Sequence, residues 1–202
     1  MRTSAIAAAA LLAGCALTSR PKPVEIRYFS PASQPPGAAG APARQALAGA
    51  PRLRLGRVTS SAHLRSRIVY RTSKVELAAY DQRRWTDEPE VYLRRSISRA
   101  LFDERPLTEA VSGPAPTLDL ELLGFEEVRR GDARSGRVEL HYTLHDEDDV
   151  LASGRVDVER PASTASMEDV VGAIAAALDE ASSEVAGVVA ARVRSGGGGD
   201  GR

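Results

Sequence analysis

Residues 118–125, Leu-Asp-Leu-Glu-Leu-Leu-Gly-Phe, open the part of the sequence that decides the fold. Apolar residues alternate with polar ones up to Leu122, as in a β-strand with one buried face. Gly124 then shifts the alternation to Phe125, which predicts a β-bulge. The same alternation returns twice, which predicts a β-meander with further strands at residues 138–145 and 156–159.

The segments on either side of this meander add a hairpin and two helices. Upstream, alternating runs at 68–71 and 75–79 predict a β-hairpin, and Thr86 is the expected N-cap of a helix. Downstream, Ser166 and Asp169 resemble a capping box that opens the longest helix, whose apolar face is built of small residues. The order strands, helix, strands, helix predicts an α+β fold, with a largely antiparallel sheet and two main helices packed on one face.

The N-terminus has the features of a bacterial signal peptide. Arg2 supplies a positive charge, and residues 5–13 form an apolar run that is too short for a permanent membrane-spanning helix. The run ends in Leu-Ala-Gly-Cys at residues 12–15, which resembles the lipobox of lipoproteins. By this resemblance the chain is cleaved after Gly14, and Cys15 then carries acyl chains that anchor it to a membrane. The alternative is an ordinary secretory signal with an incidental cysteine.

Composition divides the chain into four segments. We expect a signal peptide at 1–14, a lipidated N-terminus with a Pro/Ala/Gly-rich tether or loop at 15–51, an α+β domain at 52–194, and a disordered Gly-rich tail at 195–202. Within the second segment, residues 24–29 alternate and are a candidate first strand. Residues 30–51 are then expected to be a flexible excursion between two strands.

Charge and residue spacing exclude several classes of function. The 27 Lys and Arg residues are balanced by 27 Asp and Glu residues, and a net charge of zero argues against nucleic-acid binding. A single cysteine, Cys15, excludes an internal disulfide and a Cys-based metal site. His141 and His145 are too far apart on a strand to share one metal, no catalytic partner is identifiable for His63, and the acidic run 146–149 lacks EF-hand spacing. We therefore expect no cofactor and no catalytic residues.

The middle of the chain carries a resemblance to a known family. One strand ends in Arg71, and a second extended segment leads through Tyr80 to Trp85, after which a helix begins at once. Together with the lipobox and an early aromatic pair, Tyr28-Phe29, this arrangement resembles the ABC-type transport auxiliary lipoprotein family. Packing roles are the simpler interpretation of Arg71, Tyr80 and Trp85, and a partner or lipid surface is the alternative.

This resemblance implies a function without catalysis. The protein would be anchored by its lipid in the cell envelope, facing the periplasm, with the outer membrane favoured over the inner one. Its partners would be a periplasmic MCE-type protein and an ABC permease with its ATPase, and its role would be docking in lipid transport. The alternative is a lipoprotein of envelope assembly or of the cell wall that is unrelated to transport.

Overall fold

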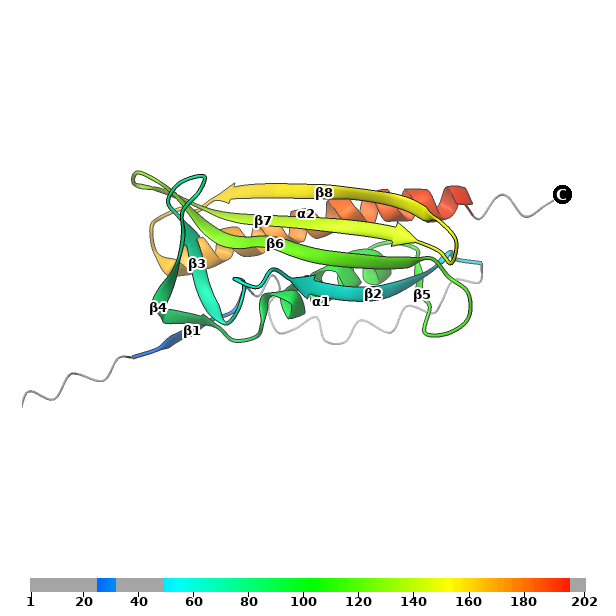
Figure 1. Ribbon diagram of the computed structural model, residues 1–202, viewed down its shortest axis with the longest axis horizontal. Coiled ribbons are helices and arrows are strands. Elements are labelled where there is room, and N and C mark those ends of the chain that lie inside the picture. Colours follow the sequence, from blue (N-terminus) through cyan, green and yellow to red (C-terminus); the bar gives the residue numbers. More distant parts are fainter. Residues whose placement is uncertain (1–24, 32–48, 197–202) are drawn as a thin grey trace, which may run out of the picture.

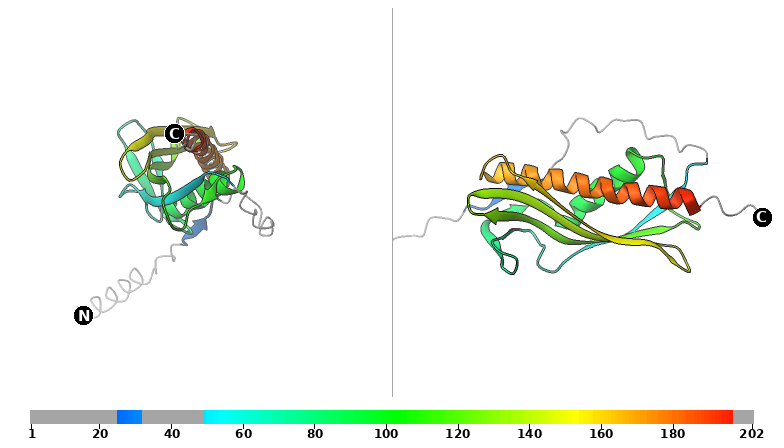
Figure 2. Two further views of the ribbon diagram at one scale, coloured as in Figure 1. Left: turned by 90° about the vertical axis from the view of Figure 1, so that its right-hand side faces the viewer. Right: turned by 90° about the horizontal axis from the view of Figure 1, so that it is seen from above.

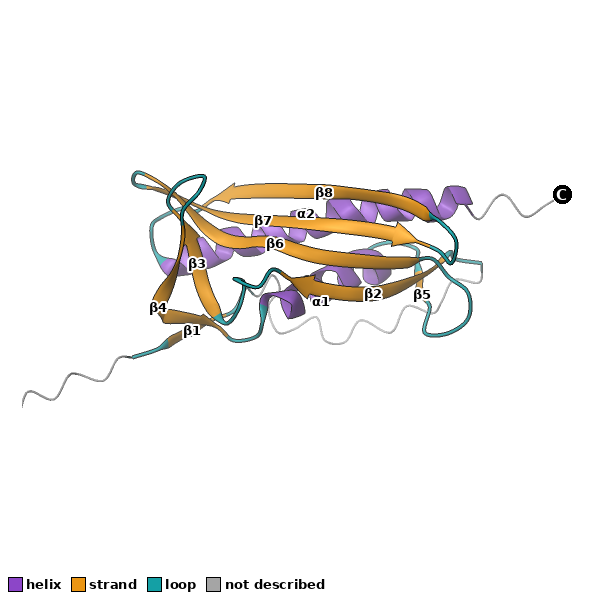
Figure 3. Ribbon diagram, in the orientation of Figure 1, coloured by secondary structure: helices purple, strands orange, loops and turns teal. Residues whose placement is uncertain are grey.

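The computed structural model describes residues 25–31 and 49–196. A long twisted sheet forms one layer of the fold, and helices form the other (Figure 1, Figure 3). In chain order the elements are β1 (Arg27–Phe29), β2 (Arg52–Ser60), β3 (Arg67–Arg71), β4 (Leu77–Trp85), α1 (Pro89–Ser98), the π-helix η2 (Arg99–Asp103), β5 (Thr108–Glu109), β6 (Thr117–Arg130), β7 (Ala133–His145), β8 (Val150–Pro161) and α2 (Met167–Gly196).

The sheet is built around β6. β7 pairs with β6 in antiparallel orientation along its whole length, and the ladder shifts at Gly124, so the predicted bulge is confirmed. The other edge of β6 is shared between β2 and β3, which both run parallel to it. Because β2 leaves β6 at Ser60 and β3 joins it at Val69, the chain makes an excursion beside the bulge, and this excursion buries Leu64 in the core.

The sheet is mixed rather than purely antiparallel. The predicted hairpin forms as β3 and β4, and β7 pairs antiparallel with β8. β1 runs parallel to the end of β4, and β5 runs parallel to the start of β2. The α+β prediction is confirmed and the longest ladders are antiparallel, whereas the parallel pairings were not anticipated.

Both α-helices lie on the same side of the sheet, as Figure 2 shows. α2 packs along β7 and β8, and α1 lies beside it against β2 and β6. Small residues allow close approach, because a Cβ atom at Gly136 would lie 2.2 Å from the backbone nitrogen of Ile174. The apolar side chains between the two layers form one core, which includes Trp85, Phe125 and Leu178.

The starts of the two helices differ in how they are capped. The Ser166 Oγ atom accepts a hydrogen bond from the Asp169 N–H (3.1 Å), so the predicted cap of α2 is confirmed. The predicted Thr86 cap is wrong, because α1 has Glu88 at its N-cap and no side chain caps it. The Thr86 hydroxyl is instead hydrogen-bonded to the Tyr92 hydroxyl (2.7 Å).

The structure describes only part of the N-terminal segments. β1 forms within the predicted 24–29 and spans Arg27–Phe29. Lipidation of Cys15 and cleavage after Gly14 concern residues outside the described ranges, as does most of the 30–51 segment.

Figure 1 shows the two ends of the molecule along its long axis. β1, the β3–β4 turn and the start of α2 lie at one end, here called the β1 end. β5, the β7–β8 turn and the end of α2 lie at the other, the β5 end. α2 continues to Gly196 and therefore includes the first two residues of the predicted 195–202 tail.

Candidate functional site

Arg71, one of the residues that carried the resemblance, binds a buried carboxylate on β6. Glu126 is fully buried. Arg71 on β3 donates to it from Nε to Oε1 (2.6 Å) and from Nη2 to Oε2 (3.3 Å). Arg137 on β7 donates to the same Oε1 atom (3.1 Å). Since β3 and β7 lie on opposite edges of β6, one carboxylate joins three strands.

Tyr80 contacts the next residue of β6, Glu127, which is also buried. The Tyr80 hydroxyl donates to Glu127 Oε2 (2.5 Å), and Arg129 Nε donates to Oε1 (2.8 Å). Arg129 Nη2 donates in turn to the Tyr80 hydroxyl, and Arg134 Nε lies 3.1 Å from Glu127 Oε1. The Arg129 guanidinium also lies 3.7 Å from the centroid of the Tyr70 ring. Glu127 thus has two guanidinium groups and a phenol around it.

The surroundings of these groups stabilise their protonated forms. Burial raises the pKa of Tyr80 above its ordinary value of 10.0, and the hydrogen bond to Glu127 raises it further. The pKa of Arg137 is also raised, mainly by its hydrogen bond to Asp157, against the opposing effect of burial. The phenol therefore stays neutral, and the guanidinium stays charged, throughout the physiological pH range.

Trp85 lies apart from this cluster, in the core between the sheet and α1. Its side chain is 2% exposed, and its ring centroid lies 5.1 Å from that of Phe125 on β6 and 6.2 Å from that of Tyr92 on α1. The structure therefore brings Arg71 and Tyr80 to neighbouring glutamates, while Trp85 fills the corner between the two layers.

Sequence reasoning did not single out Glu126 and Glu127. Two adjacent glutamates are typical of an exposed strand or turn, because unpaired charges are rarely buried. The available signal was their position inside an apolar strand, between the buried residues Phe125 and Val128. A charge at such a position requires a partner of opposite sign.

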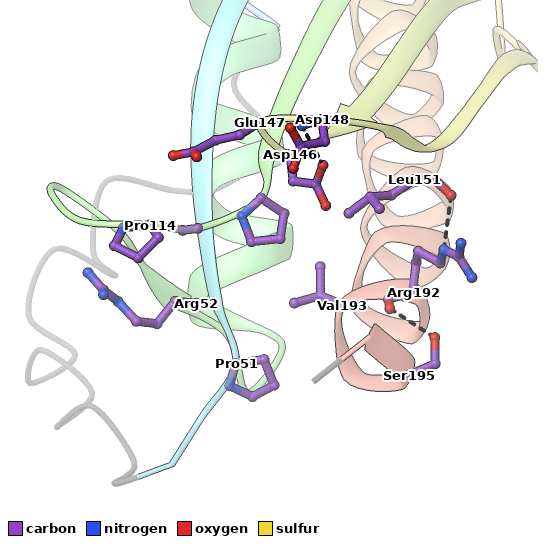
Figure 4. A pocket seen from close by; sticks show the side chains of 12 residues that line it. Pro51, Arg52, Pro114, Asp146, Glu147, Asp148, Leu151, Arg192, Val193 and Ser195 are labelled. Atoms are coloured by element: carbon purple, nitrogen blue, oxygen red, sulfur yellow. Dashed lines mark hydrogen bonds between the residues drawn. The ribbon is translucent and has the colours of Figure 1, made fainter. Parts of the chain in front are cut away.

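A cavity of about 860 Å³ opens at the β5 end of the molecule (Figure 4). Its wall combines the start of β2, the loop before β6, the β7–β8 turn and the end of α2, which are far apart in the sequence. Its apolar lining includes Pro51, Pro114, Pro116, Leu151 and Val193. The cavity has the volume of a ligand or peptide site.

Charged residues surround the apolar lining of this cavity. The Asp146 carboxylate accepts hydrogen bonds from the backbone N–H groups of Asp149 (2.8 Å) and Asp148 (3.1 Å), which lower the pKa of Asp146. Arg52 and Arg192 each donate to a backbone carbonyl of a neighbouring segment (2.6 and 2.9 Å). An apolar lining with charges of both signs suits an amphipathic binding partner.

The three histidines do not converge on one site. His141 Nε2 lies 3.2 Å from Ser153 Oγ, His145 Nε2 lies 3.5 Å from Asp119 Oδ2, and His63 is exposed. Within residues 25–31 and 49–196, no group of three or more His, Cys, Asp or Glu side chains is placed to hold a metal ion. No helix in the described part of the chain is long and apolar enough to cross a bilayer.

These features define a class of protein: a two-layer α+β domain with a buried carboxylate pair and a cavity at one end of its sheet. The family model for the ABC-type transport auxiliary lipoprotein component matches residues 33–186. The chain belongs to this family, so the resemblance found in the sequence is confirmed, and the protein is an envelope lipoprotein auxiliary to an ABC transport system.

Solved structures share the fold. A crystal structure of a protein from Xanthomonas campestris is 22% identical, covers 85% of this chain and 99% of its own, and superposes with a TM-score of 0.71. An uncharacterized protein is 17% identical over 68% of this chain and 92% of its own, with a TM-score of 0.61. A hypothetical protein from Chlamydia trachomatis is 10% identical over 71% of this chain and 97% of its own, with a TM-score of 0.50. No curated protein matches the chain.

Proposed function

We propose that the protein is a lipid-anchored, non-catalytic docking module of an ABC/MCE-type system that transports lipids across the cell envelope. The chain is cleaved after Gly14, and Cys15 then carries the lipid anchor. The domain is held at the outer membrane and faces the periplasm. A periplasmic MCE-type protein and an ABC permease with its ATPase are the partners. Membership of the auxiliary family supports this proposal.

The position of the cavity is the observation that carries the docking role. β1 begins twelve residues after Cys15, so the anchored end of the domain is the β1 end. The cavity lies at the opposite end of the long axis. A binding surface there projects away from the anchoring membrane, towards a partner that spans the periplasm.

Site-specific crosslinking in the native membrane tests the docking role. A photoreactive residue at Glu147, on the rim of the cavity, is compared with one at Asp132, in the exposed β6–β7 turn at the β1 end. We expect Glu147 to crosslink to an MCE-type protein or a permease subunit and Asp132 to give none of these products. Crosslinks from Glu147 to peptidoglycan or to β-barrel assembly factors would favour the envelope-assembly alternative and contradict the transport role.

Acyl labelling tests the anchor separately. Cells grown with a radiolabelled or alkyne-tagged fatty acid should label the native chain and fail to label Cys15→Ser, because only a thiol at this position forms the thioether. The Cys15→Ser chain should also leave the membrane fraction. Labelling that persists in Cys15→Ser would contradict the anchor.

A further inference from the structure

Arginines gather at a corner of the sheet where β1, the end of β4 and the start of β3 meet. In the strand register, Tyr28 of β1 lies beside Arg84 of β4, and Arg84 lies beside Arg67 of β3. Directly opposed residues share one face of a sheet, so these three side chains form a row across three strands. The Trp85 N–H donates to the Ser66 carbonyl (2.7 Å), which keeps the start of β3 against the end of β4.

The arginines of this corner oppose one another instead of pairing with carboxylates. Arg67 lies opposite Arg84, and Arg27 lies opposite Arg83. Like charges in directly opposed positions are destabilising. Arg27 is neutralised by Glu168 (2.8 Å). Arg83 shares the face of Arg27, and the charge of Glu168 attracts it as well. On the other face, Arg67 and Arg84 form no ion pair among the described residues, so the corner holds an excess of positive charge there.

The polar contacts of these groups leave their charge available. Within the described ranges, Arg84 donates only to the backbone carbonyls of Tyr80 and Arg83. Arg65 and Arg67 are exposed, and neither makes a side-chain hydrogen bond within the described part of the chain. A single exposed carboxylate on this part of β4, Asp81, does not balance them.

Apolar side chains are exposed next to the arginines. Ile26 is 45% exposed and Tyr28 is 64% exposed, and both lie on the same side of the chain, two residues apart. Exposed large apolar residues beside cationic ones are the composition of surfaces that enter the headgroup region of a bilayer.

We propose that this corner, formed by Ile26, Tyr28, Arg65, Arg67 and Arg84, binds the phosphate groups of anionic phospholipids and holds the β1 end on the membrane. The proposal rests on the anchoring of Cys15 stated above. Glu25 comes ten residues after Cys15, and a fully extended chain spans at most about 35 Å over that length, so the anchor keeps the corner near the headgroups. Arginine binds phosphate through paired N–H donors, and tyrosine is favoured at the membrane interface.

Headgroup contact can be measured on the lipidated full-length protein with a single thiol label. Cys15 is the only cysteine and lipidation consumes its thiol, so an introduced cysteine is the only labelling site. Ser30→Cys, next to β1, is compared with Ser112→Cys at the β5 end, since both serines are exposed. Each labelled protein is placed on vesicles of phosphatidylcholine alone or with phosphatidylglycerol, and a headgroup spin label is used to quench the fluorophore.

We expect the label at residue 30 to be quenched at least twofold more than that at residue 112 on vesicles with phosphatidylglycerol. Arg67→Glu should abolish this difference, because it reverses a charge in the row. Arg57→Glu should preserve it, because Arg57 is an exposed arginine of β2 outside the corner. Equal quenching at residues 30 and 112 overturns the proposal, as does an unchanged difference in Arg67→Glu.

Flotation on vesicles of phosphatidylcholine alone reports the lipid anchor, independently of the corner. Failure to float there contradicts anchoring at Cys15, while quenching on anionic vesicles still decides the role of the corner. A protein that floats neither on neutral nor on anionic vesicles contradicts both the anchor at Cys15 and the membrane role of the corner. In native membranes, crosslinks from Ser30→Cys to a protein, together with equal quenching on vesicles, would assign the corner to a protein partner and overturn the proposal.

Discussion

Glu126 and Glu127 are neighbours on β6, yet they face opposite sides of the sheet because successive side chains of a strand alternate. Glu127 lies in register with Gly136, against which α2 packs, so it belongs to the helix side. Glu126 belongs to the other side, where it links Arg71 and Arg137. Glu126 therefore ties β3, β6 and β7 together on one face of the sheet, and Glu127 links β4, β6 and β7 on the other.

Removal of the Glu126 carboxylate should be strongly destabilising. Glu126→Ala leaves Arg71 without its carboxylate partner in a partly buried position, and breaking a buried ion pair costs about 3–5 kcal/mol. Arg95→Ala, which breaks the exposed pair with Asp87, should cost about 1 kcal/mol or less. Urea unfolding of both variants measures the free energies, and an equal loss in the two would contradict a special role for Glu126.

Tyr80 should make stability depend on pH on the alkaline side. Because the pKa of Tyr80 is raised in the folded state, its contribution to stability is complete below pH 10.0 and is lost as the pH rises through the folded-state pKa. Tyr80→Phe should therefore be less stable than the native protein at pH 7, and the two stabilities should converge above pH 10. Urea midpoints between pH 7 and 11 measure this. Tyr28→Phe, at an exposed ring, is the control and should show no such convergence.

At the scale of elements, the contact between α2 and β7 depends on a residue without a side chain. A Cβ atom at Gly136 would lie 2.2 Å from the Ile174 nitrogen and 2.5 Å from the Ala173 carbonyl carbon. Both are backbone atoms of a long helix, which cannot move aside locally. The spacing between the two layers is therefore set at this point.

Gly136→Ala should destabilise the protein by about 1–3 kcal/mol or more, since it separates α2 from β7. Gly172→Ala is a matched control within α2, where a new Cβ meets nothing within 4 Å. This second change should stabilise the protein by about 0.5–1 kcal/mol, because alanine favours a helix over glycine. Thermal unfolding compares the variants, and opposite signs are the expected result.

The elements that could be predicted from the sequence are those with a strong local pattern. Alternation identified the meander, Gly124 marked the bulge, and Ser166 marked the start of α2. The parallel pairing of β2 and β3 with β6 has no local signal, because it depends on which edge of β6 is free. The cavity could not be predicted for the same reason, as its lining extends from Pro51 to Ser195.

At the scale of the whole molecule, the described residues share one hydrophobic core. Trp85, the only tryptophan, is buried within it and contacts both the sheet and α1. Its fluorescence therefore reports on the packing of the two layers, while far-ultraviolet circular dichroism reports on the strands and helices.

Thermal unfolding should follow the same curve by both signals. A single core predicts one cooperative transition, and coincidence of independent probes is the test for it. The comparison should use the full chain, with Trp85→Phe as the blank for fluorescence. Separate midpoints would mean that part of the sheet unfolds independently of the core around Trp85.

β1 also sets how the protein responds to mechanical load. A pull on the proposed anchor enters the domain through β1, whose three residues are mostly exposed, whereas β7 has thirteen residues and lies inside the sheet. Because the strand is short, we expect it to detach from β4 under load before the meander is disturbed. Tension between the membrane and a partner would then be relieved by the loss of β1, while the rest of the domain stays folded.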